Sequence, residues 1–172
     1  MILHLPAEWP QFYTATIEGW DHLLKEEKYK HVIVNSLKFL TENKRVKVNA
    51  FVIMNNHIHM IWQAVANTDL EQVQTMFKKY TAQQFIKMLK ADGNLEKYKV
   101  NKADRKHHFW KRNSLGTELF TPAVFIQKLN YIHYNPVRAG LCSLPEEYKY
   151  SSANFYSCGE DQFGILEDYR GS

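Results

Sequence analysis

The chain has 172 residues, of which 45% are hydrophobic and 14% aromatic, so it can bury a substantial core and we expect a single globular domain. Its net charge of +4 is compatible with a nucleic-acid partner but does not require one. No stretch reaches the roughly 18 consecutive apolar residues of a membrane helix, and the two cysteines form no metal-spaced pair. These features argue against a disulfide framework and a membrane partner, and they favour a cytoplasmic protein.

The first ninety residues alternate between strand-like and helix-like patterns. Aromatic and β-branched residues at a period of two predict strands, whereas apolar residues that recur every three or four positions predict amphipathic helices. On this basis the predicted strands are residues 12–18, 47–54 and 57–63, and the predicted helices are residues 25–43 and 70–89. The second and third strands are separated by two asparagines and should form an antiparallel hairpin.

His57 and His59 open the second strand of that hairpin. Because side chains alternate between the two faces of a strand, both imidazoles should point to one face, with Ile58 on the other. Neutral imidazoles are common metal ligands, so this pair could converge on one cation. Two histidines at this spacing in an apolar strand are more often core or surface residues than ligands, and a pair is one donor short of a convincing metal site.

The segment between residues 97 and 112 is strongly basic. Its lysines and arginines are offset only by Asp104, and Tyr98, Phe109 and Trp110 are interleaved with them. Basic side chains attract phosphates and aromatic rings stack on unpaired bases, so the segment suits single-stranded nucleic acid. A solvated loop whose aromatic residues reach the core is an equally good interpretation. The candidate DNA-binding residues here are Lys97, Lys99, Lys102, Arg105, Lys106, Trp110, Lys111 and Arg112.

The last part of the chain predicts a short strand at residues 117–120 and a third helix from Pro122 to about residue 134. The end of the chain is acidic. We expect residues 1–158 to form the single domain and residues 159–172 to form an acidic tail, which either folds back over a basic groove or is loose.

One face of the third helix carries a polar constellation. Lys128, Tyr131 and Asn135 follow one another at i, i+3 and i+7. Tyrosine is a poor nucleophile at neutral pH unless a metal, a base or a cationic neighbour helps its proton leave, and Lys128 is a candidate helper. Pro136 disfavours helical geometry at Asn135, so it stays open whether that residue completes the face. His133 lies on a different face, where we expect a surface role.

The element order predicts an α+β fold, an antiparallel sheet with two helices on one face. His57 and His59 would then lie on the opposite face. If the third helix crosses that face, Tyr131 approaches a metal held by the two histidines, and the Asn135 amide oxygen offers a third ligand. His107 and His108 are adjacent and so should point to opposite sides of a strand, which favours groove-lining or surface positions over metal binding.

Two motifs together resemble a known family. His57-Ile58-His59 resembles the His-hydrophobic-His motif of the HUH single-strand DNA endonucleases. Residues 131–141, YIHYNPVRAGL, resemble the tyrosine helix of REP-associated tyrosine transposases, which belong to that superfamily. Residues 109–112 resemble the aromatic-basic segment upstream of that helix. The likeness covers roughly residues 10–155, with two departures: Asn56, where the family often has proline, and residues 113–125, which look less acidic than is usual in the family.

The resemblance implies a ferredoxin-like (RRM-like) sheet with the tyrosine helix on its free face. It also implies a divalent metal ion, Mg²⁺ or Mn²⁺, and a tyrosine that cuts single-stranded DNA through a 5′-phosphotyrosine bond. By position, Tyr131 would be the nucleophile, and His57, His59 and Asn135 would be metal ligands. Lys128 and Arg138 join the candidate DNA-binding residues, although Arg138 also suits a structural role at the helix end.

We expect a single-stranded or hairpin DNA partner, a nucleoid-associated location when the protein is bound to DNA, and a possible homodimer. Two other functions stay open. The chain could be a catalytically idle or partner-dependent nucleic-acid-binding module of the same fold, which would bind in a salt-sensitive way without a metal. A zinc hydrolase would need a third strong ligand and a carboxylate base, and the sequence offers no obvious candidate for either.

Overall fold

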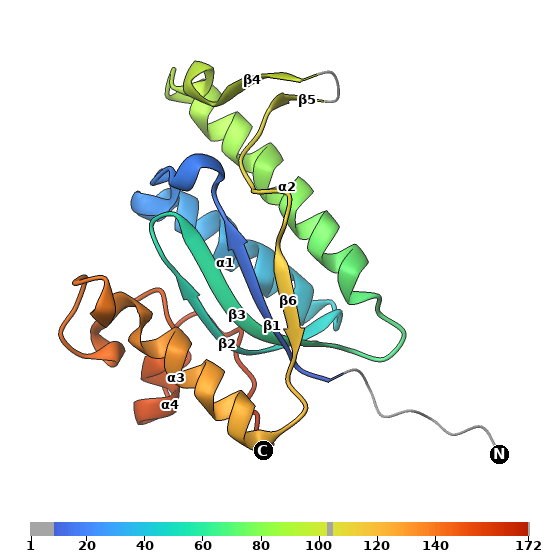
Figure 1. The fold of residues 1–172 in the computed structure, drawn as a ribbon, viewed down its shortest axis with the longest axis vertical. Coiled ribbons are helices and arrows are strands. Elements are labelled where there is room, and N and C mark those ends of the chain that lie inside the picture. The colour runs from blue at the N-terminus through green and yellow to red at the C-terminus, as the bar shows by residue number, and fades with distance from the viewer. Residues whose placement is uncertain (1–8, 103–104, 172) are drawn as a thin grey trace.

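The structure is a computed structural model that describes residues 9–102 and 105–171, with side chains described outside residues 101–106. A four-stranded sheet forms its centre, α1 and α2 lie on one face of the sheet, and α3 lies on the other (Figure 1). This arrangement confirms the predicted α+β fold. Within the described residues, no helix combines the length and the apolar character needed to cross a membrane.

All the pairings in the main sheet are antiparallel, and the strand order is β2-β3-β1-β6. The alternating and β-branched segments of the sequence supply the three long strands, and a register shift between Val48 and Ala50 marks a bulge in β2. Thr14 lies opposite His59 and Thr16 opposite His57 in the β1–β3 ladder. The strands are β1 (Gln11–Thr16), β2 (Val46–Ile53), β3 (His57–Ala64) and β6 (Leu115–Glu118).

The larger part of the core lies between the sheet and two long helices, α1 (Glu27–Glu42) and α2 (Leu70–Ala91). The apolar stripes of both helices face Ile58, Met60 and Trp62, which are at most 1% exposed. The alternation in β3 therefore buries these three side chains on the side of α1 and α2. His57 and His59, which alternate with them along the strand, stand on the opposite face.

The second core lies under α3 (Pro122–Arg138), which packs on the other face of the sheet. The Thr121 hydroxyl caps this helix by accepting a bond from Val124 N at 3.2 Å. The expected end near residue 134 is wrong, because the helix continues through Pro136 to Arg138. Pro136 is buried near the helix end, and the Ala139 and Leu141 amides donate to the Asn135 and Pro136 carbonyls, so the final turn stays helical.

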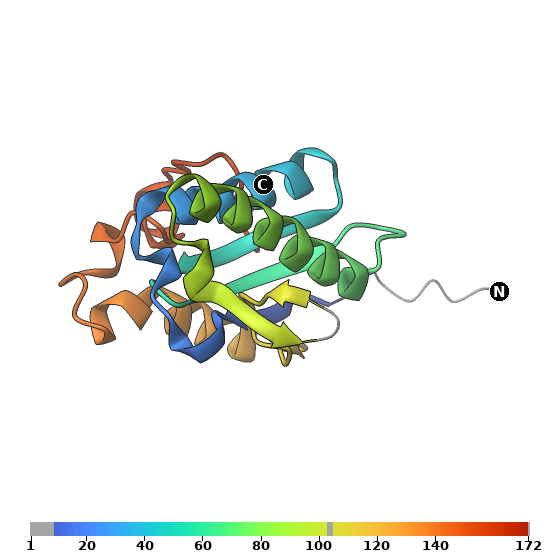
Figure 2. The same ribbon diagram turned by 90° about the horizontal axis from the view of Figure 1, so that it is seen from above.

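The basic segment forms a small sheet that the sequence analysis did not predict. β4 (Lys99–Lys102) pairs with β5 (Arg105–His107), and the pair lies beyond the C-terminal end of α2, apart from the main sheet (Figures 1 and 2). Short helices complete the described chain: η1 (Glu18–Trp20), η2 (Leu23–Lys25), η3 (Leu95–Tyr98), η4 (Pro145–Glu147) and α4 (Ala153–Cys158).

The acidic end of the chain is neither loose nor folded over the basic segment. Leu166 forms a parallel bridge with Val48, and the Glu167 amide donates to the Val48 carbonyl at 2.9 Å. Ile165 is buried, and Lys47 and Glu167 form an ion pair at 2.7 Å. The segment therefore runs along β2 and pairs part of an edge that would otherwise be open.

Candidate active site

His57 and His59 stand side by side on the face of the sheet that α3 covers. Their ring centroids are 4.7 Å apart, and the two rings meet at 70°. His59 is 6% exposed, whereas His57 is half-buried at the start of β3. This is the shared face that the alternation of the strand predicts.

Hydrogen bonds from neighbouring residues orient both imidazoles. The Asn56 amide oxygen lies 2.6 Å from His57 Nδ1, and the Thr14 hydroxyl lies 2.8 Å from His59 Nδ1. An amide oxygen only accepts, so His57 Nδ1 carries the proton and its Nε2 carries a lone pair. Bonds of this kind set the orientation and tautomer of metal-binding histidines in other proteins.

Both rings are neutral at physiological pH. Burial lowers the pKa of His57, and the nearby Asn135 side chain, which favours the protonated ring, offsets part of this effect. Burial, together with the neighbouring His57, Lys128 and Arg138, lowers the pKa of His59 to about 3. A neutral imidazole is the form that binds a metal, so the environment keeps both rings ready to act as ligands.

α3 brings Tyr131 to this pair. The Tyr131 ring centroid lies 5.2 Å from that of His59 and 6.0 Å from that of Phe12, and both contacts are edge-to-face. The tyrosine side chain is 42% exposed, whereas Phe12 is buried beneath it. The phenol is therefore next to the histidines and still accessible to a large substrate.

Asn135 completes the same face of α3 because the helix does not end before Pro136. Its side chain lies near the His57 ring and acts against the effect of burial on the pKa of that ring. The structure thus brings His57, His59, Tyr131 and Asn135 together from two elements that are about seventy residues apart in the sequence. Asn135 stays helical although proline follows it, because the helix continues without a break through Pro136.

Two cations flank Tyr131. Arg138 Nη2 donates to the Tyr131 carbonyl oxygen at 2.8 Å, and its guanidinium carbon lies 4.9 Å from the centroid of the tyrosine ring. Lys128 Nζ lies 5.8 Å from the same centroid and 4.8 Å from that of Phe12. Positive charge at these positions attracts a phosphate and offsets negative charge on a phenol oxygen.

The donor chemistry of this cluster fits a divalent metal ion. Two neutral imidazoles and an amide oxygen form a mixed nitrogen and oxygen set, which manganese accepts more readily than magnesium on ligand softness. The described residues contain no cluster of three or more His, Cys, Asp or Glu side chains placed to hold a metal. A zinc hydrolase site of the usual composition is therefore not found among them, and Asn135 is the third ligand that the sequence analysis predicts for the histidine pair.

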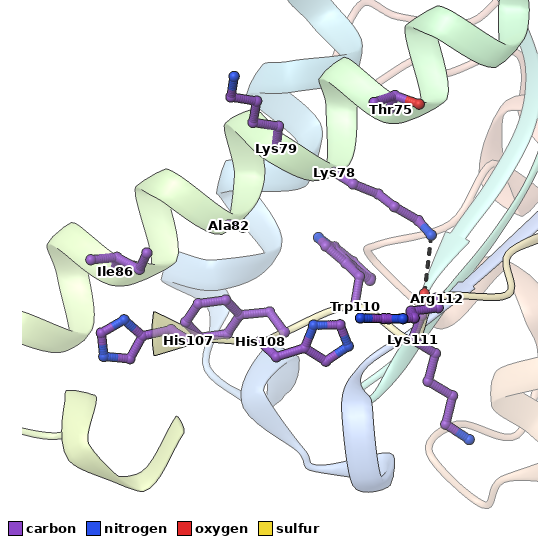
Figure 3. A pocket seen from close by; sticks show the side chains of 11 residues that line it. Thr75, Lys78, Lys79, Ala82, Ile86, His107, His108, Trp110, Lys111 and Arg112 are labelled. Atoms are coloured by element: carbon purple, nitrogen blue, oxygen red, sulfur yellow. Dashed lines mark hydrogen bonds between the residues drawn. The ribbon is translucent and has the colours of Figure 1, made fainter. Parts of the chain in front are cut away.

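A second feature is a basic pocket of about 580 Å³ between α2 and residues 107–112 (Figure 3). Lys78, Lys79, Lys111 and Arg112 line it; Lys78 Nζ reaches across to donate to the Lys111 carbonyl at 3.1 Å, whereas the Lys79 and Lys111 side chains point in opposite directions. Burial lowers the pKa of Lys78. The sequence analysis missed Lys78 and Lys79, although two adjacent lysines in the middle of an amphipathic helix were a visible signal.

Trp110 does not face solvent, as a base-stacking role would require. Its side chain is 5% exposed, and Nε1 donates to Thr81 Oγ1 at 2.9 Å in the core beneath α2. The predicted DNA contact of Trp110 is therefore wrong. Burying this large apolar ring stabilises the fold more than leaving it on the surface would. At this position the aromatic residue therefore reaches the core, as the alternative interpretation of the basic segment predicted.

The other candidate residues occupy varied positions. Lys97 pairs with Asp21 at 2.7 Å and Lys99 with Glu96 at 3.5 Å, both at the surface. The predicted contacts of Lys102, Arg105 and Lys106 fall on side chains outside the described part of the structure.

The remaining histidines differ in burial. His107 and His108 line the basic pocket, and His108 is buried with Nε2 3.1 Å from Glu18 Oε2. The expected surface role of His133 is wrong, because this ring is buried and lies 2.8 Å from the Ser152 hydroxyl.

Comparison with known proteins identifies a family for this geometry. No curated protein matches the sequence. A solved REP-associated tyrosine transposase bound to a REP hairpin has the same fold, with a TM-score of 0.67, 15% identity, and coverage of 96% of this chain and 92% of that chain. A structure from Deinococcus radiodurans R1 has a TM-score of 0.48 and 11% identity over 77% of this chain and 95% of that one. The model of the IS200-like transposases matches residues 21–133, and this chain belongs to that family.

Proposed function

We propose that this protein cleaves and rejoins single-stranded DNA, with Tyr131 as the nucleophile and a divalent metal ion held by His57, His59 and Asn135. The observation that carries the proposal is the position of the Tyr131 ring, 5.2 Å from that of His59. Family membership supports a transposase. The hairpin in the solved relative supports hairpin-associated DNA as the substrate here.

The proposed step is a transesterification that conserves the number of phosphoester bonds. Tyr131 Oη attacks phosphorus as its proton leaves, and the bond between phosphorus and the 3′ oxygen breaks. The 3′ oxygen takes up a proton, and the 5′ phosphate stays joined to the tyrosine. Attack by a 3′ hydroxyl of another strand end reverses these changes and releases the enzyme, so the reaction needs no external energy source.

The surrounding residues of the chain assist this step. Lys128 and Arg138 would hold the phosphate beside the phenol and offset the negative charge on its oxygen as the proton leaves. His57 and His59 would hold Mg²⁺ or Mn²⁺ through neutral nitrogens, with Asn135 as the third ligand. A divalent ion bound there would supply Lewis-acid chemistry, withdrawing charge from the phosphate.

The basic pocket would hold the rest of the DNA. Lys78, Lys79, Lys111 and Arg112 line it, and a phosphate backbone is the natural partner of such a surface. The pocket is made by α2 and the segment that leads to β6, so it lies on a different part of the fold from α3. A folded hairpin in this pocket and a single strand at Tyr131 form a consistent arrangement.

Covalent capture tests the proposal. The wild type and Tyr131→Phe are incubated with a library of single-stranded and hairpin DNA and manganese, and the products are separated under denaturing conditions. We expect a protein–DNA adduct from the wild type alone, and sequencing of the trapped strands would identify the target. Tyr131→Phe should bind DNA as the wild type does, because only the phenol oxygen is removed.

Matched variants separate the metal site from the nucleophile. His59→Gln should lose both the adduct and manganese binding, whereas Tyr134→Phe, which removes an exposed phenol from the same helix, should keep both. An adduct that persists in Tyr131→Phe would remove Tyr131 as the nucleophile. DNA and manganese binding by a wild type that forms no adduct would instead support a catalytically idle or partner-dependent binding module.

A further inference from the structure

Trp20 is an exposed aromatic residue in an unusual backbone conformation. Its side chain is 56% exposed, and its φ is 57°, directly after Gly19 with φ of 65°. The left-handed region is unfavourable for a bulky residue other than glycine, and the conformation persists only where the surroundings enforce it. Such outliers cluster at functional sites, so the reason for a tryptophan at this position requires an explanation.

The surroundings that enforce this conformation belong to the hairpin that carries the histidines. The Ile17 amide donates to the Asn56 carbonyl at 2.8 Å, and the Leu24 amide donates to the Asn55 carbonyl at 3.0 Å. The Asn56 side-chain amide also donates to the Trp20 carbonyl at 3.5 Å. Residues 17–24 are thereby held against the turn that precedes His57.

The indole lies between the basic pocket and the histidine pair. Its ring centroid is 6.4 Å from that of His57, with the rings at 76° to each other. Lys111, whose side chain leads away from α2 (Figure 3), places Nζ 4.1 Å from the Trp20 ring centroid. Lys111 also lines the basic pocket. A DNA strand that extends from this pocket to Tyr131 would therefore pass Trp20 and His57.

We propose that Trp20 is the stacking platform for an unpaired DNA base beside the phosphate that Tyr131 attacks, an inference that rests on the proposed function. A flat ring binds any base through its π-face, and a neighbouring cation holds the adjoining phosphate. The Lys111 ammonium faces the indole, and Trp20 is still exposed enough to receive a base. Stacking next to His57 would hold the strand in register for cleavage.

The experiment measures binding in a Tyr131→Phe background, so that no strand is cut. The probe is a fluorescent random-sequence single strand of about 20 nucleotides with manganese, titrated at several salt concentrations. Trp20→Asn removes the ring while keeping a residue that tolerates the left-handed conformation, so this variant should fold. Trp20→Phe keeps a smaller ring that can still stack.

We expect Trp20→Asn to weaken binding by about 5-fold to 150-fold, the effect of losing one stacked base. Its salt dependence should match that of the parent because no phosphate contact is lost, whereas Lys111→Ala should lower the salt slope by about one. Trp20→Phe should recover most of the affinity. Phe39→Ala is the control, since Phe39 is 62% exposed on α1.

Three results would overturn the inference: Trp20→Asn binding as tightly as the parent, Trp20→Phe losing as much affinity as Trp20→Asn, or a parallel loss of manganese affinity in Trp20→Asn. The last would show that the residue acts through His57. Failure of the proposed function looks different, because then the wild type forms no covalent adduct or the parent binds no single strand.

Discussion

The Asn56 amide oxygen lies 2.6 Å from His57 Nδ1 and holds that ring in the tautomer a metal requires. Removing the oxygen should loosen the ring, so we expect Asn56→Ala to weaken manganese binding by about 10-fold to 100-fold. Isothermal titration of the purified variant with manganese measures this change. Thr14→Val, which removes the corresponding partner of His59, should have a similar effect.

Asn113→Ala is the control for that titration, because Asn113 is an exposed asparagine on the segment between the basic pocket and β6. Its manganese affinity should equal that of the wild type. An Asn56→Ala protein with unchanged affinity would show that the hairpin backbone alone positions His57. The asparagine would then be a neutral departure from the proline that resembling transposases often carry.

Arg138 holds the turn of α3 that carries the nucleophile, through the Tyr131 carbonyl and across its ring. Loss of this clamp should misplace the phenol, and we expect Arg138→Met to lower the single-turnover rate of adduct formation by about 100-fold. Arg138→Lys keeps the charge without the planar fork and should recover only part of the rate. Equal rates in Arg138→Met and the wild type would contradict a positioning role.

Strand periodicity was enough to predict which side chains share a face. The alternation in β3 puts His57 and His59 opposite Ile58, and helical spacing puts Lys128 and Tyr131 on one side of α3. These are local rules, and they hold because each face is buried against a different layer. The family resemblance then supplied the expectation that α3 crosses the histidine face, which local periodicity alone does not require.

Tertiary contacts decide the points that the sequence analysis missed. Pro136 stays helical because it is buried near the end of α3. His133 is buried because it meets Ser152, a partner nineteen positions along the chain that no helical spacing reveals. Trp110 follows a run of basic residues, yet its ring enters the core beneath α2. In each case the contacts made in the folded protein outweigh the preference predicted from the neighbouring sequence. Those contacts come from residues distant in the sequence, so they cannot be predicted from local patterns.

Ser152 links three elements in the second core. Its hydroxyl lies 2.8 Å from His133 Nε2 and accepts from the Phe51 amide at 3.0 Å. Ser152→Ala would leave the buried His133 nitrogen unsatisfied, so we expect the free energy of unfolding to fall by about 1–3 kcal/mol. Urea denaturation measures the change, with Ser157→Ala on exposed α4 as the control. Identical midpoints for Ser152→Ala and the wild type would contradict it.

Asp21 joins the segment before α1 to the segment after α2. Burial raises the pKa of its carboxyl, but hydrogen bonds from Lys97 and Tyr98 together lower it more, so the pKa in the folded state is below the usual value of 3.8. A lowered pKa stabilises the fold above about pH 4, and this contribution is lost as the pH falls through the folded-state pKa.

Asp21→Asn should therefore lower the free energy of unfolding by about 1 kcal/mol at neutral pH, and its difference from the wild type should shrink as the pH falls through the folded-state pKa of Asp21. Chemical denaturation at a series of pH values measures both. The same difference at every pH would mean that the asparagine acts through packing rather than through the lost charge.

Trp110 separates a structural role from a DNA-binding role within the basic segment. Its ring packs 6.2 Å from the Phe77 centroid and 6.0 Å from the Phe85 centroid, so Trp110→Ala should lower the free energy of unfolding by about 3–5 kcal/mol. Trp110→Phe keeps most of this packing and loses the bond to Thr81, for an expected cost of about 1–2 kcal/mol. Denaturation curves of the two variants test this order.

DNA binding by the same variants completes the test. Because the indole is buried, Trp110→Phe should bind single-stranded DNA as tightly as the wild type at a temperature where both are folded. Lys79→Ala, which removes a charge that lines the basic pocket, should instead weaken binding to all sequences and reduce its salt dependence. If Trp110→Phe is folded but has lost its affinity for DNA, Trp110 contacts DNA after all.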